Sequence, residues 1–392
     1  MNTPILYLDH SATTPVCPEA VEAMMQVLRD GYGNPSSRHT LGRQAAALVQ
    51  KATEQIMDAL GVKQGALIFT SGGTEANNLA ILGRAEAKPR LQGGTILTTQ
   101  GEHASVEAPL AYLQQKGYSI AYLPTKEGVL DFSVAESFAA KKMLLATAMT
   151  VNNETGAVYD IKALSQYVHQ HFPDALVHTD ATQGFLKVDC SPQNTKVDML
   201  TLSGHKIGAP KGIGALWISP DVIKTRGLLP RKIGGGQCQD LRSGTENVPG
   251  IVALGVACEV GKKQQKEKTE KMAQFRLSLL EELQNDARFR AVTVLTPKHP
   301  APHILSLAIP GLPAETLLNF LSQKGICVSA GSACASNHHQ SKASAALLAY
   351  GVPEKTALST IRLSFDGTET QQDKERFLSL LSDALTFLYR RR

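Results

Sequence analysis

The chain has 392 residues, of which 43% are hydrophobic and 19% charged, and its formal net charge is +5. These proportions are typical of a globular protein with one large domain and a smaller one. So small a net charge, spread over the chain, makes no electrostatic case for nucleic acid, and we expect no direct nucleic-acid binding.

The spacing of the cysteines and the first residues of the chain bear on the cellular compartment in which the protein is expected. The six cysteines are widely scattered and form no Cys-x-x-Cys pair, so we do not expect a disulfide framework. The first residues, MNTPILYLDH, have neither a positive leader nor a long apolar run. No apolar stretch approaches the roughly 20 residues of a membrane span. We therefore expect a cytoplasmic protein with reduced thiols and no membrane association.

The first two thirds of the chain alternate short apolar, β-branched runs with longer amphipathic segments. Strands interleaved with helices predict an α/β domain built on a mostly parallel sheet. In such sheets ligands bind at the carboxyl ends of the strands, so the residues just after each run are of interest. The expected strands are 66–70, 95–99, 144–151, 176–179, 199–202 and 213–218.

From about residue 248 the pattern changes and predicts a second, smaller domain. A helical stretch over 250–261 continues into KKQQKEKTEK, which we interpret as the solvated face of a long connecting helix. Beyond it we expect a strand over 303–309, a helix over 314–323 and an alternating strand over 361–365. The last helix has its apolar residues on one face: Phe377, Leu378, Leu381, Ala384, Leu385 and Leu388.

Three motifs follow predicted strands of the large domain. SGGTEANN (71–78) is a glycine turn that opens a helix, where free N–H groups can bind a phosphate; it lacks the ending of a nucleotide-binding loop. Asp180 closes a strand and could cap a helix or pair with a protonated ring nitrogen. Lys206, in SGHK, could be a solvated lysine or a Schiff-base amine. A phosphate site, such a lysine and such an acid are together what pyridoxal phosphate (PLP) requires.

A fourth motif, AGSACASNHHQ (330–340), places Cys334 among small residues that cannot build a core. We expect an exposed, mobile arm. Cys334 with His338 and His339 could begin a zinc site, but the paired-ligand spacing of such sites is absent, and we expect no metal. The histidines are alternatively solvated, or one of them assists ionisation of the thiol.

These motifs, together with YLDHSATTP (7–15), GEHAS (101–105), VNNETG (151–156) and HTDATQ (178–183), resemble the class V aminotransferase superfamily, in the same order and over nearly the whole chain. RSGTEN (242–247) and GSACAS (331–336) narrow the resemblance to cysteine desulfurases of the NifS/IscS kind. It implies an α/β PLP-dependent transferase of fold type I and a homodimer. The large domain, with a mostly parallel sheet of the seven-stranded type, is expected over 15–260. The smaller α+β domain with the cysteine arm is expected over 1–14 and 261–392.

The resemblance also implies a role for each matching residue. Lys206 is similar to the lysine that links to PLP, Asp180 to the acid at the pyridinium nitrogen, and His103 to the histidine that stacks on the ring and handles protons. Cys334 resembles the residue that takes sulfur from L-cysteine as a persulfide, leaving alanine. Further cofactor contacts are implied for Gly73, Thr74, Asn153, Gln183, Ser203, His205 and, from a second subunit, Thr245; Asn153 and Arg362 resemble the substrate carboxylate clamp.

The expected function is therefore that of a cysteine desulfurase that passes sulfur to a protein acceptor, for iron–sulfur clusters, thiolation of tRNA or cofactors, or a similar use. Two alternatives stay open from the sequence. One is a selenocysteine lyase or another class V PLP enzyme, although a transaminase needs no thiol arm. The other is a non-catalytic scaffold for sulfur transfer, against which the intact Lys206, Asp180, His103 and Cys334 argue. The chain departs from relatives with long arms at 337–342, where an acidic-Pro-Ser entry into the next helix is usual.

Overall fold

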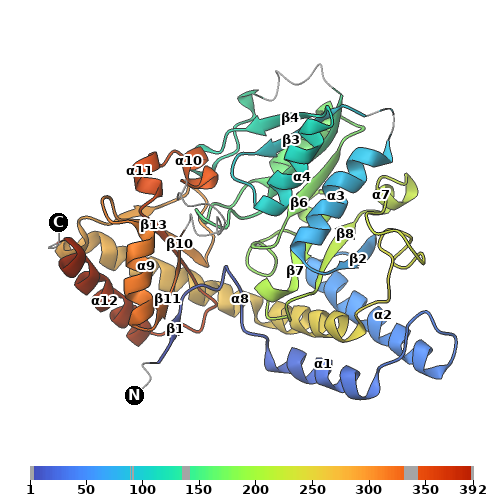
Figure 1. Cartoon of the computed structure of the whole chain (residues 1–392), viewed down its shortest axis with the longest axis horizontal. Coiled ribbons are helices and arrows are strands. Elements are labelled where there is room, and N and C mark those ends of the chain that lie inside the picture. Colours follow the sequence, from blue (N-terminus) through green and yellow to red (C-terminus); the bar gives the residue numbers. More distant parts are fainter. Residues whose placement is uncertain (1–3, 89, 91, 135–141, 331–342, 390–392) are drawn as a thin grey trace.

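The computed structural model describes residues 4–88, 90, 92–134, 142–330 and 343–389. Its large sheet has seven strands in the order β2-β8-β7-β6-β5-β3-β4 (Figure 1). Within this sheet β8 runs antiparallel to both of its neighbours, and the other pairs are parallel. The strands are β2 (Ala66–Thr70), β3 (Thr95–Thr99), β4 (Ser119–Leu123), β5 (Met143–Met149), β6 (Leu176–Asp180), β7 (Met199–Ser203) and β8 (Gly214–Ile218).

Helices cover both faces of this sheet, which is why its central strands are buried. Every residue of β2, β3, β5, β7 and β8 is buried, as expected of strands covered on both sides. One face packs against α3 (Gly73–Ala87) and α4 (Ala104–Gln115). The other face packs against α2 (Thr40–Leu60), α5 (Ile161–His171) and the start of α8. Outside them lie α1 (Pro18–Asp30), α6 (Pro192–Thr195) and α7 (Pro220–Lys224).

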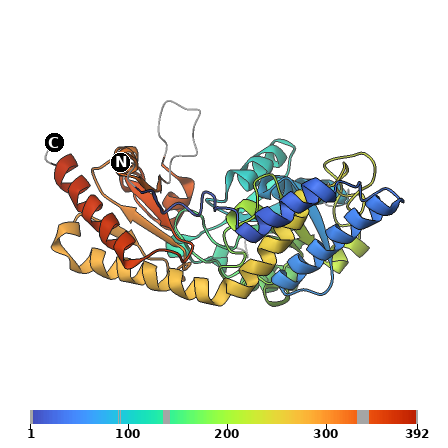
Figure 2. The same ribbon diagram turned by 90° about the horizontal axis from the view of Figure 1, so that it is seen from below.

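One long helix, α8 (Val248–Asn285), passes from the large sheet to the second part of the molecule (Figure 2). Ile251 and Leu254 in its first half are buried in the large core, whereas Leu279 and Leu283 near its end are buried in the second core. The expected helix over 250–261 and the charged run after it are thus one helix of 38 residues. Neither α8 nor any other helix in the described ranges is both long and apolar enough to cross a membrane.

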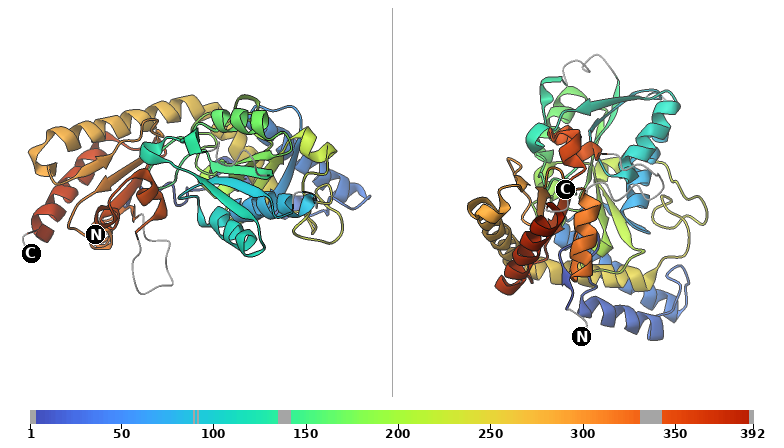
Figure 3. Two further views of the ribbon diagram at one scale, coloured as in Figure 1. Left: turned by 90° about the horizontal axis from the view of Figure 1, so that it is seen from above. Right: turned by 60° about the vertical axis from the view of Figure 1, so that its left-hand side comes forward.

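The second core is built on a sheet of four strands in the order β12-β13-β10-β9, and β1 pairs with β11. In the left-hand view of Figure 3 this part of the molecule, in orange and red, lies at the end of α8 away from the large sheet. Leu6 and Leu8 of the N-terminal segment are buried in this core, together with residues from the end of the chain. The strands are β1 (Leu6–Tyr7), β9 (Thr293–Leu295), β10 (Ile304–Ala308), β11 (Ile326–Cys327), β12 (Ser329–Ala330) and β13 (Thr360–Ser364). The helices are α9 (Ala314–Gln323), α10 (Ala345–Tyr350), α11 (Glu354–Ala357) and α12 (Gln371–Tyr389).

The expected fold class is confirmed, with differences at the ends and edges of elements. The strand expected over 144–151 is β5, which ends at Met149, and the strand expected over 303–309 is β10. Strand β4, at the edge of the large sheet, was not predicted; Ser119 and Tyr122 in it are exposed. Its apolar run over 120–123 is as long as those of predicted strands, so the sequence signal was present and was overlooked.

The buried His178 makes acid stability a test of the fold. It lies on β6, its Nδ1 is 2.8 Å from Thr147 Oγ1, and its Nε2 is 3.0 Å from Thr201 Oγ1. Burial lowers the pKa of His178 to about 4, although the charge of Asp180 opposes the shift. Between its ordinary pKa near 6.5 and about 4, the unfolded chain binds a proton that the folded chain does not, so stability falls as the pH falls.

We predict that His178→Gln removes part of this pH dependence. The slope of the unfolding free energy against pH should decrease by up to about 1.4 kcal/mol per pH unit between pH 6 and 5. Urea unfolding of the apo protein at several pH values measures it. The matched control His299→Gln, at an exposed position, should keep the wild-type slope. Equal slopes for the wild type and His178→Gln would contradict the prediction.

Candidate active site

Three turns meet at the carboxyl edge of the large sheet, after β2, β6 and β7. A Cβ atom added to Gly73, the first residue of α3, would lie 3.1 Å from Thr182 Oγ1 and 3.4 Å from Ser203 Cβ. Glycine therefore lets the start of α3 approach the other two turns closely. The free N–H groups of this helix start, with Thr74 in its first turn and Ser203 beside it, form a cradle suited to an anion.

Asp180 is held in place at the end of β6 by two donors. The side chain is 5% exposed. Its Oδ1 accepts a hydrogen bond from the Thr182 N–H (2.9 Å), and its Oδ2 accepts one from Asn77 Nδ2 (2.7 Å). Asn77 Nδ2 also donates to Ser105 Oγ (2.8 Å), which lies 2.8 Å from His103 Nδ1. Hydrogen bonds thus connect the predicted residues His103 and Asp180.

The sequence analysis gave no role to Asn77 or Ser105. Both belong to motifs that it singled out, SGGTEANN and GEHAS. Their burial, at 0% and 7% exposed, is unusual for an amide and a hydroxyl. The sequence signal that could have identified Asn77 and Ser105 is that each is a polar residue about one helical turn after a glycine of its motif.

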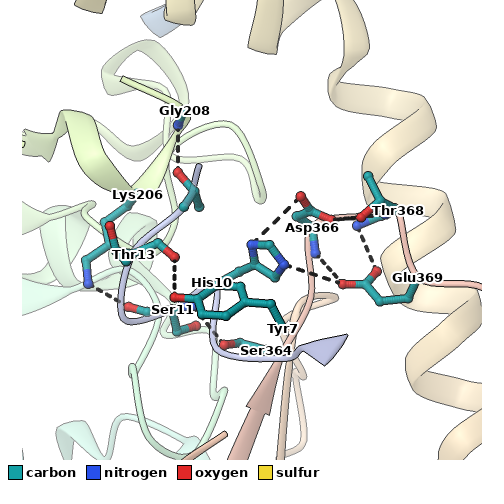
Figure 4. Close-up of polar contacts among 12 residues, drawn as sticks. Tyr7, His10, Ser11, Thr13, Lys206, Gly208, Ser364, Asp366, Thr368 and Glu369 are labelled. Carbon is teal, nitrogen blue, oxygen red and sulfur yellow. Dashed lines mark hydrogen bonds and ion pairs between the residues drawn. The ribbon is translucent and has the colours of Figure 1, made fainter. Parts of the chain in front are cut away.

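Lys206 and Gln183 both contact the N-terminal segment, and Figure 4 shows the Lys206 side chain beside Ser11. The Lys206 amine donates to the carbonyl oxygens of Ser11 (2.6 Å) and Ala12 (2.7 Å). Gln183 Nε2 donates to the same Ser11 carbonyl at 2.8 Å. Lys206 ends the short 3-10 turn η4 (Gly204–Lys206) directly after β7. The structure therefore brings the predicted residues Lys206 and Gln183 to the same backbone carbonyl.

Two titratable groups next to Lys206 have lowered pKa values. Burial, together with the charges of the nearby Lys206, Lys211 and Lys187, lowers the pKa of His205 to about 4. Burial, with the charge of Lys206, lowers the pKa of Lys187 to about 7, against the opposing charge of Asp366. Lys187 Nζ donates to the Lys206 carbonyl at 3.2 Å. At neutral pH His205 is therefore an uncharged neighbour of Lys206.

Arg362 reaches the site from β13 of the smaller sheet. Its Nη1 donates to the Asn153 carbonyl (2.8 Å), and its Nη2 forms an ion pair with Asp9 (2.8 Å). Asp9 also accepts a hydrogen bond from Ser329 Oγ (2.8 Å). The structure thus brings the predicted pair Asn153 and Arg362 together. It adds Asp9, which the sequence analysis quoted in YLDHSATTP without a role.

Of the remaining predicted residues, Thr245 is not brought into this arrangement. Cys334, His338 and His339 lie outside the described residues. Thr245 is exposed in the segment ahead of α8. That segment is tied to α3 through Arg242, whose Nε lies 3.0 Å from Glu75 Oε1.

A further polar cluster lies beside the N-terminal segment. His10 is 5% exposed; its Nδ1 is 3.8 Å from Asp366 Oδ2 and its Nε2 is 4.0 Å from Glu369 Oε1 (Figure 4). Burial lowers the pKa of His10, against the opposing charge of Asp366. Both separations are too long for hydrogen bonds. Because each carboxylate approaches a different ring nitrogen, the groups resemble a loose charge cluster more than a chelate.

Comparison with known proteins identifies the family. The model of the family "Aminotransferase class-V" matches residues 6–377. The chain is 38% identical over 389 residues to "Cysteine desulfurase" of Trichormus azollae, covering 97% of this chain and 92% of that protein. It is 37% identical over 372 residues to "Putative cysteine desulfurase IscS 1" of Bacillus subtilis strain 168, covering 94% and 96%.

Similar solved structures support the same family. The chain is similar to a "NIFS-LIKE PROTEIN" with a TM-score of 0.88 and 33% identity, covering 98% of this chain and 100% of that chain. It is similar to "SspA in complex with cysteine" with a TM-score of 0.78 and 31% identity, covering 93% and 99%. The chain belongs to the class-V aminotransferases. Within them it belongs to the cysteine desulfurase family.

Membership of this family implies PLP as the cofactor, and the residues present fit that group. Gly73 leaves space at a helix start for a phosphate, and Asp180 is a buried carboxylate for a ring nitrogen. Gln183 Oε1 is buried and has no hydrogen-bond partner among the described residues. An unused polar atom in a buried site is expected where a bound group completes the hydrogen bonds.

We predict that Gly73→Ala weakens PLP binding about tenfold. The added methyl group must displace Thr182 or Ser203, and such overpacking costs about 1–3 kcal/mol. Titration of the apo protein with PLP, followed by absorbance, measures the dissociation constant. The neighbouring substitution Asn78→Ala should leave it unchanged, whereas wild-type affinity in Gly73→Ala would show that the cradle is not the phosphate site.

Proposed function

We propose that this protein takes sulfur from L-cysteine, releases L-alanine and passes the sulfur, held as a persulfide on Cys334, to a protein acceptor. The observation that carries this proposal is the convergence of Lys206, Gln183, Asp180 and His103 at one sheet edge, with Arg362 reaching toward it from the other sheet. The similar SspA structure contains cysteine, which supports cysteine as the substrate.

The cofactor in this proposal is PLP, held by residues of three turns. Gly73, Thr74, Ser203 and His205 would hold the phosphate, and Asp180 would pair with the ring nitrogen. Gln183 and Asn153 would contact the ring, and His103 would stack on it. When bound, PLP supplies an electron sink for negative charge that develops at the substrate Cα.

Arg362 and Lys206 have the principal roles toward the substrate. The Arg362 guanidinium would bind the cysteine carboxylate, because its Nε is buried and has no partner among the described residues. The Lys206 amine would hold the cofactor and later carry a proton to and from Cα. The uncharged His205 beside it does not compete for that proton at neutral pH.

Sulfur transfer requires the thiolate of Cys334. In the proposed step this sulfur forms a bond to the sulfur of cysteine while the substrate Cβ–S bond breaks. The electron pair of that bond goes to the substrate carbon skeleton, which takes up a proton and leaves as alanine. An acceptor thiol or cluster scaffold then takes the outer sulfur of the persulfide.

Three further parts of the proposal concern organisation. We propose a homodimer in which Thr245 contacts the phosphate bound by the partner subunit; its exposed position before α8 supports this. We propose the domain division 15–260 against 1–14 with 261–392, supported by the two separate cores. We also propose a cytoplasmic location, with an acceptor from an iron–sulfur or thiolation system.

Two substitutions test the central proposal. With L-cysteine and a reductant, Lys206→Ala should lose alanine and sulfide formation by at least a hundredfold, because the amine that moves the proton is gone. Cys334→Ser should lose sulfide and the protein-bound persulfide while retaining the PLP absorbance. The controls are Lys211→Ala, at an exposed position, and Cys327→Ser.

Wild-type protein that binds no PLP would overturn the enzyme proposal. Full sulfide release by Cys334→Ser would overturn the role of Cys334 alone. Turnover of selenocysteine with none of cysteine would instead indicate a selenocysteine lyase.

Arg362→Lys tests the carboxylate clamp separately. Lysine keeps the charge but not the planar pair of donors, so we expect KM for cysteine to rise about tenfold or more, with an unchanged PLP spectrum. Steady-state alanine formation measures KM. Arg290→Lys, at an exposed position, serves as the control; an unchanged KM in Arg362→Lys would place the substrate carboxylate elsewhere.

A further inference from the structure

We propose that Asn77 is a positioning residue for this reaction, acting together with Ser105. One side-chain amide would orient the Asp180 carboxylate and, through Ser105, set which nitrogen of His103 carries the ring proton. The inference rests on the proposed function for its meaning in catalysis. Its geometry rests on the hydrogen bonds alone.

The orientation of the Asn77 amide is fixed by its surroundings. The side chain is 0% exposed, and its Nδ2 lies 2.7 Å from Asp180 Oδ2 and 2.8 Å from Ser105 Oγ. If the amide were flipped, its oxygen would face a carboxylate oxygen at 2.7 Å, with no proton between them. Nδ2 must therefore face Asp180, and its two protons go to Asp180 and to Ser105.

The Ser105 hydroxyl then has one direction left for its own proton. Because Oγ accepts from Asn77, its hydrogen can be donated to His103 Nδ1, 2.8 Å away. The backbone N–H of Ser105 also donates to His103 Nδ1, at 3.1 Å. Two donors on one nitrogen require that nitrogen to be unprotonated, so the neutral ring carries its proton on Nε2.

This assignment has a chemical consequence. His103 is predicted to face the cofactor ring and to handle protons, and the nitrogen available for that is Nε2. The network sets this tautomer before substrate arrives, so the ring need not turn over during the reaction. It also keeps both oxygens of Asp180 as acceptors, as Thr182 N–H occupies Oδ1.

The position of Asn77 on α3 explains how one helix serves both ends of a bound cofactor. Gly73 and Asn77 are four residues apart and therefore lie on the same face of α3. The first contributes to the anion cradle at the helix start, and the second faces the buried carboxylate one turn further. A shift of α3 would disturb phosphate binding and Asp180 together.

The test distinguishes the hydrogen bond from Asn77 to Asp180 from the hydrogen bonds that lead from Asn77 through Ser105 to His103. In apo protein labelled with ring-¹⁵N histidine, the His103 signals are identified by their loss in His103→Gln. Wild type at pH 8 should show the tautomer protonated at Nε2. Ser105→Ala removes the hydroxyl donor to His103 Nδ1 but keeps the backbone N–H of residue 105, so it should raise the population protonated at Nδ1 only in part and lower kcat by up to about tenfold with an unchanged KM.

Asn77→Ala removes the hydrogen bonds to both Asp180 and Ser105. Besides the effects of Ser105→Ala, it should therefore lower the PLP affinity about tenfold or more, because a hydrogen bond to a buried carboxylate is lost. Ser105→Thr, which keeps the hydroxyl, should restore the wild-type tautomer. The control Asn78→Ala changes an amide on the same helix that donates to the Thr74 carbonyl, and it should behave as wild type.

The tautomer assignment is overturned if the wild type at pH 8 carries the His103 ring proton on Nδ1, and the role of Ser105 is overturned if Ser105→Ala keeps both the wild-type NMR signals and the wild-type kcat. The role of Asn77 toward Asp180 is overturned if Asn77→Ala binds PLP as tightly as the wild type does. Failure of the proposed function has a different appearance: wild-type protein would then make no alanine from cysteine, while the histidine signals of the apo variants would still change as expected.

Discussion

The buried carboxylate of Asp180, at the end of β6, requires hydrogen-bond donors, and the elements that supply them form the candidate site. Moving an unpaired carboxylate out of water costs several kcal/mol or more. Asp180 receives a hydrogen bond from Asn77 on α3 and another from the N–H of Thr182. For Asn77 to reach it, α3 must start close against the carboxyl edge of the sheet, and a glycine at position 73 allows that approach. The anion cradle is a consequence of the same packing.

A second dependence concerns the N-terminal segment, which connects the two cores. Leu6 and Leu8 are buried in the smaller core, and the Ser11 carbonyl accepts from Lys206 in the larger one. The Ser11 N–H donates to Ser364 Oγ at the end of β13 (2.7 Å). Because Arg362 lies on the same strand, this segment sets how the clamp residue sits relative to Lys206. The hydrogen bonds of Ser11 to Lys206 and to Ser364 thus fix the position of the proposed substrate site between the two sheets.

The central strands and the residues that follow them could be predicted from sequence because their signals are local. A continuous apolar run such as 66–70 identifies a strand covered on both faces, and Lys206 and Asp180 stand directly after such runs. The link from Asn77 to Ser105 joins residues 28 positions apart. No periodic pattern encodes such a pair, since it depends on how α3 and α4 pack. The edge strand β4 was missed although its apolar run over 120–123 is a local signal of the same kind.

The electrostatics around Lys206 follow from unequal burial. Lys187 and His205 both lie near this amine, and a cluster of like charges out of water is unfavourable. Burial lowers the pKa of Lys187 to about 7 and that of His205 to about 4, so His205 is uncharged at neutral pH and Lys187 is near its midpoint. An anionic ligand at this edge would favour the protonated form of Lys187. Binding a phosphate or a carboxylate would therefore be coupled to proton uptake by Lys187, whose Nζ donates to the Lys206 carbonyl.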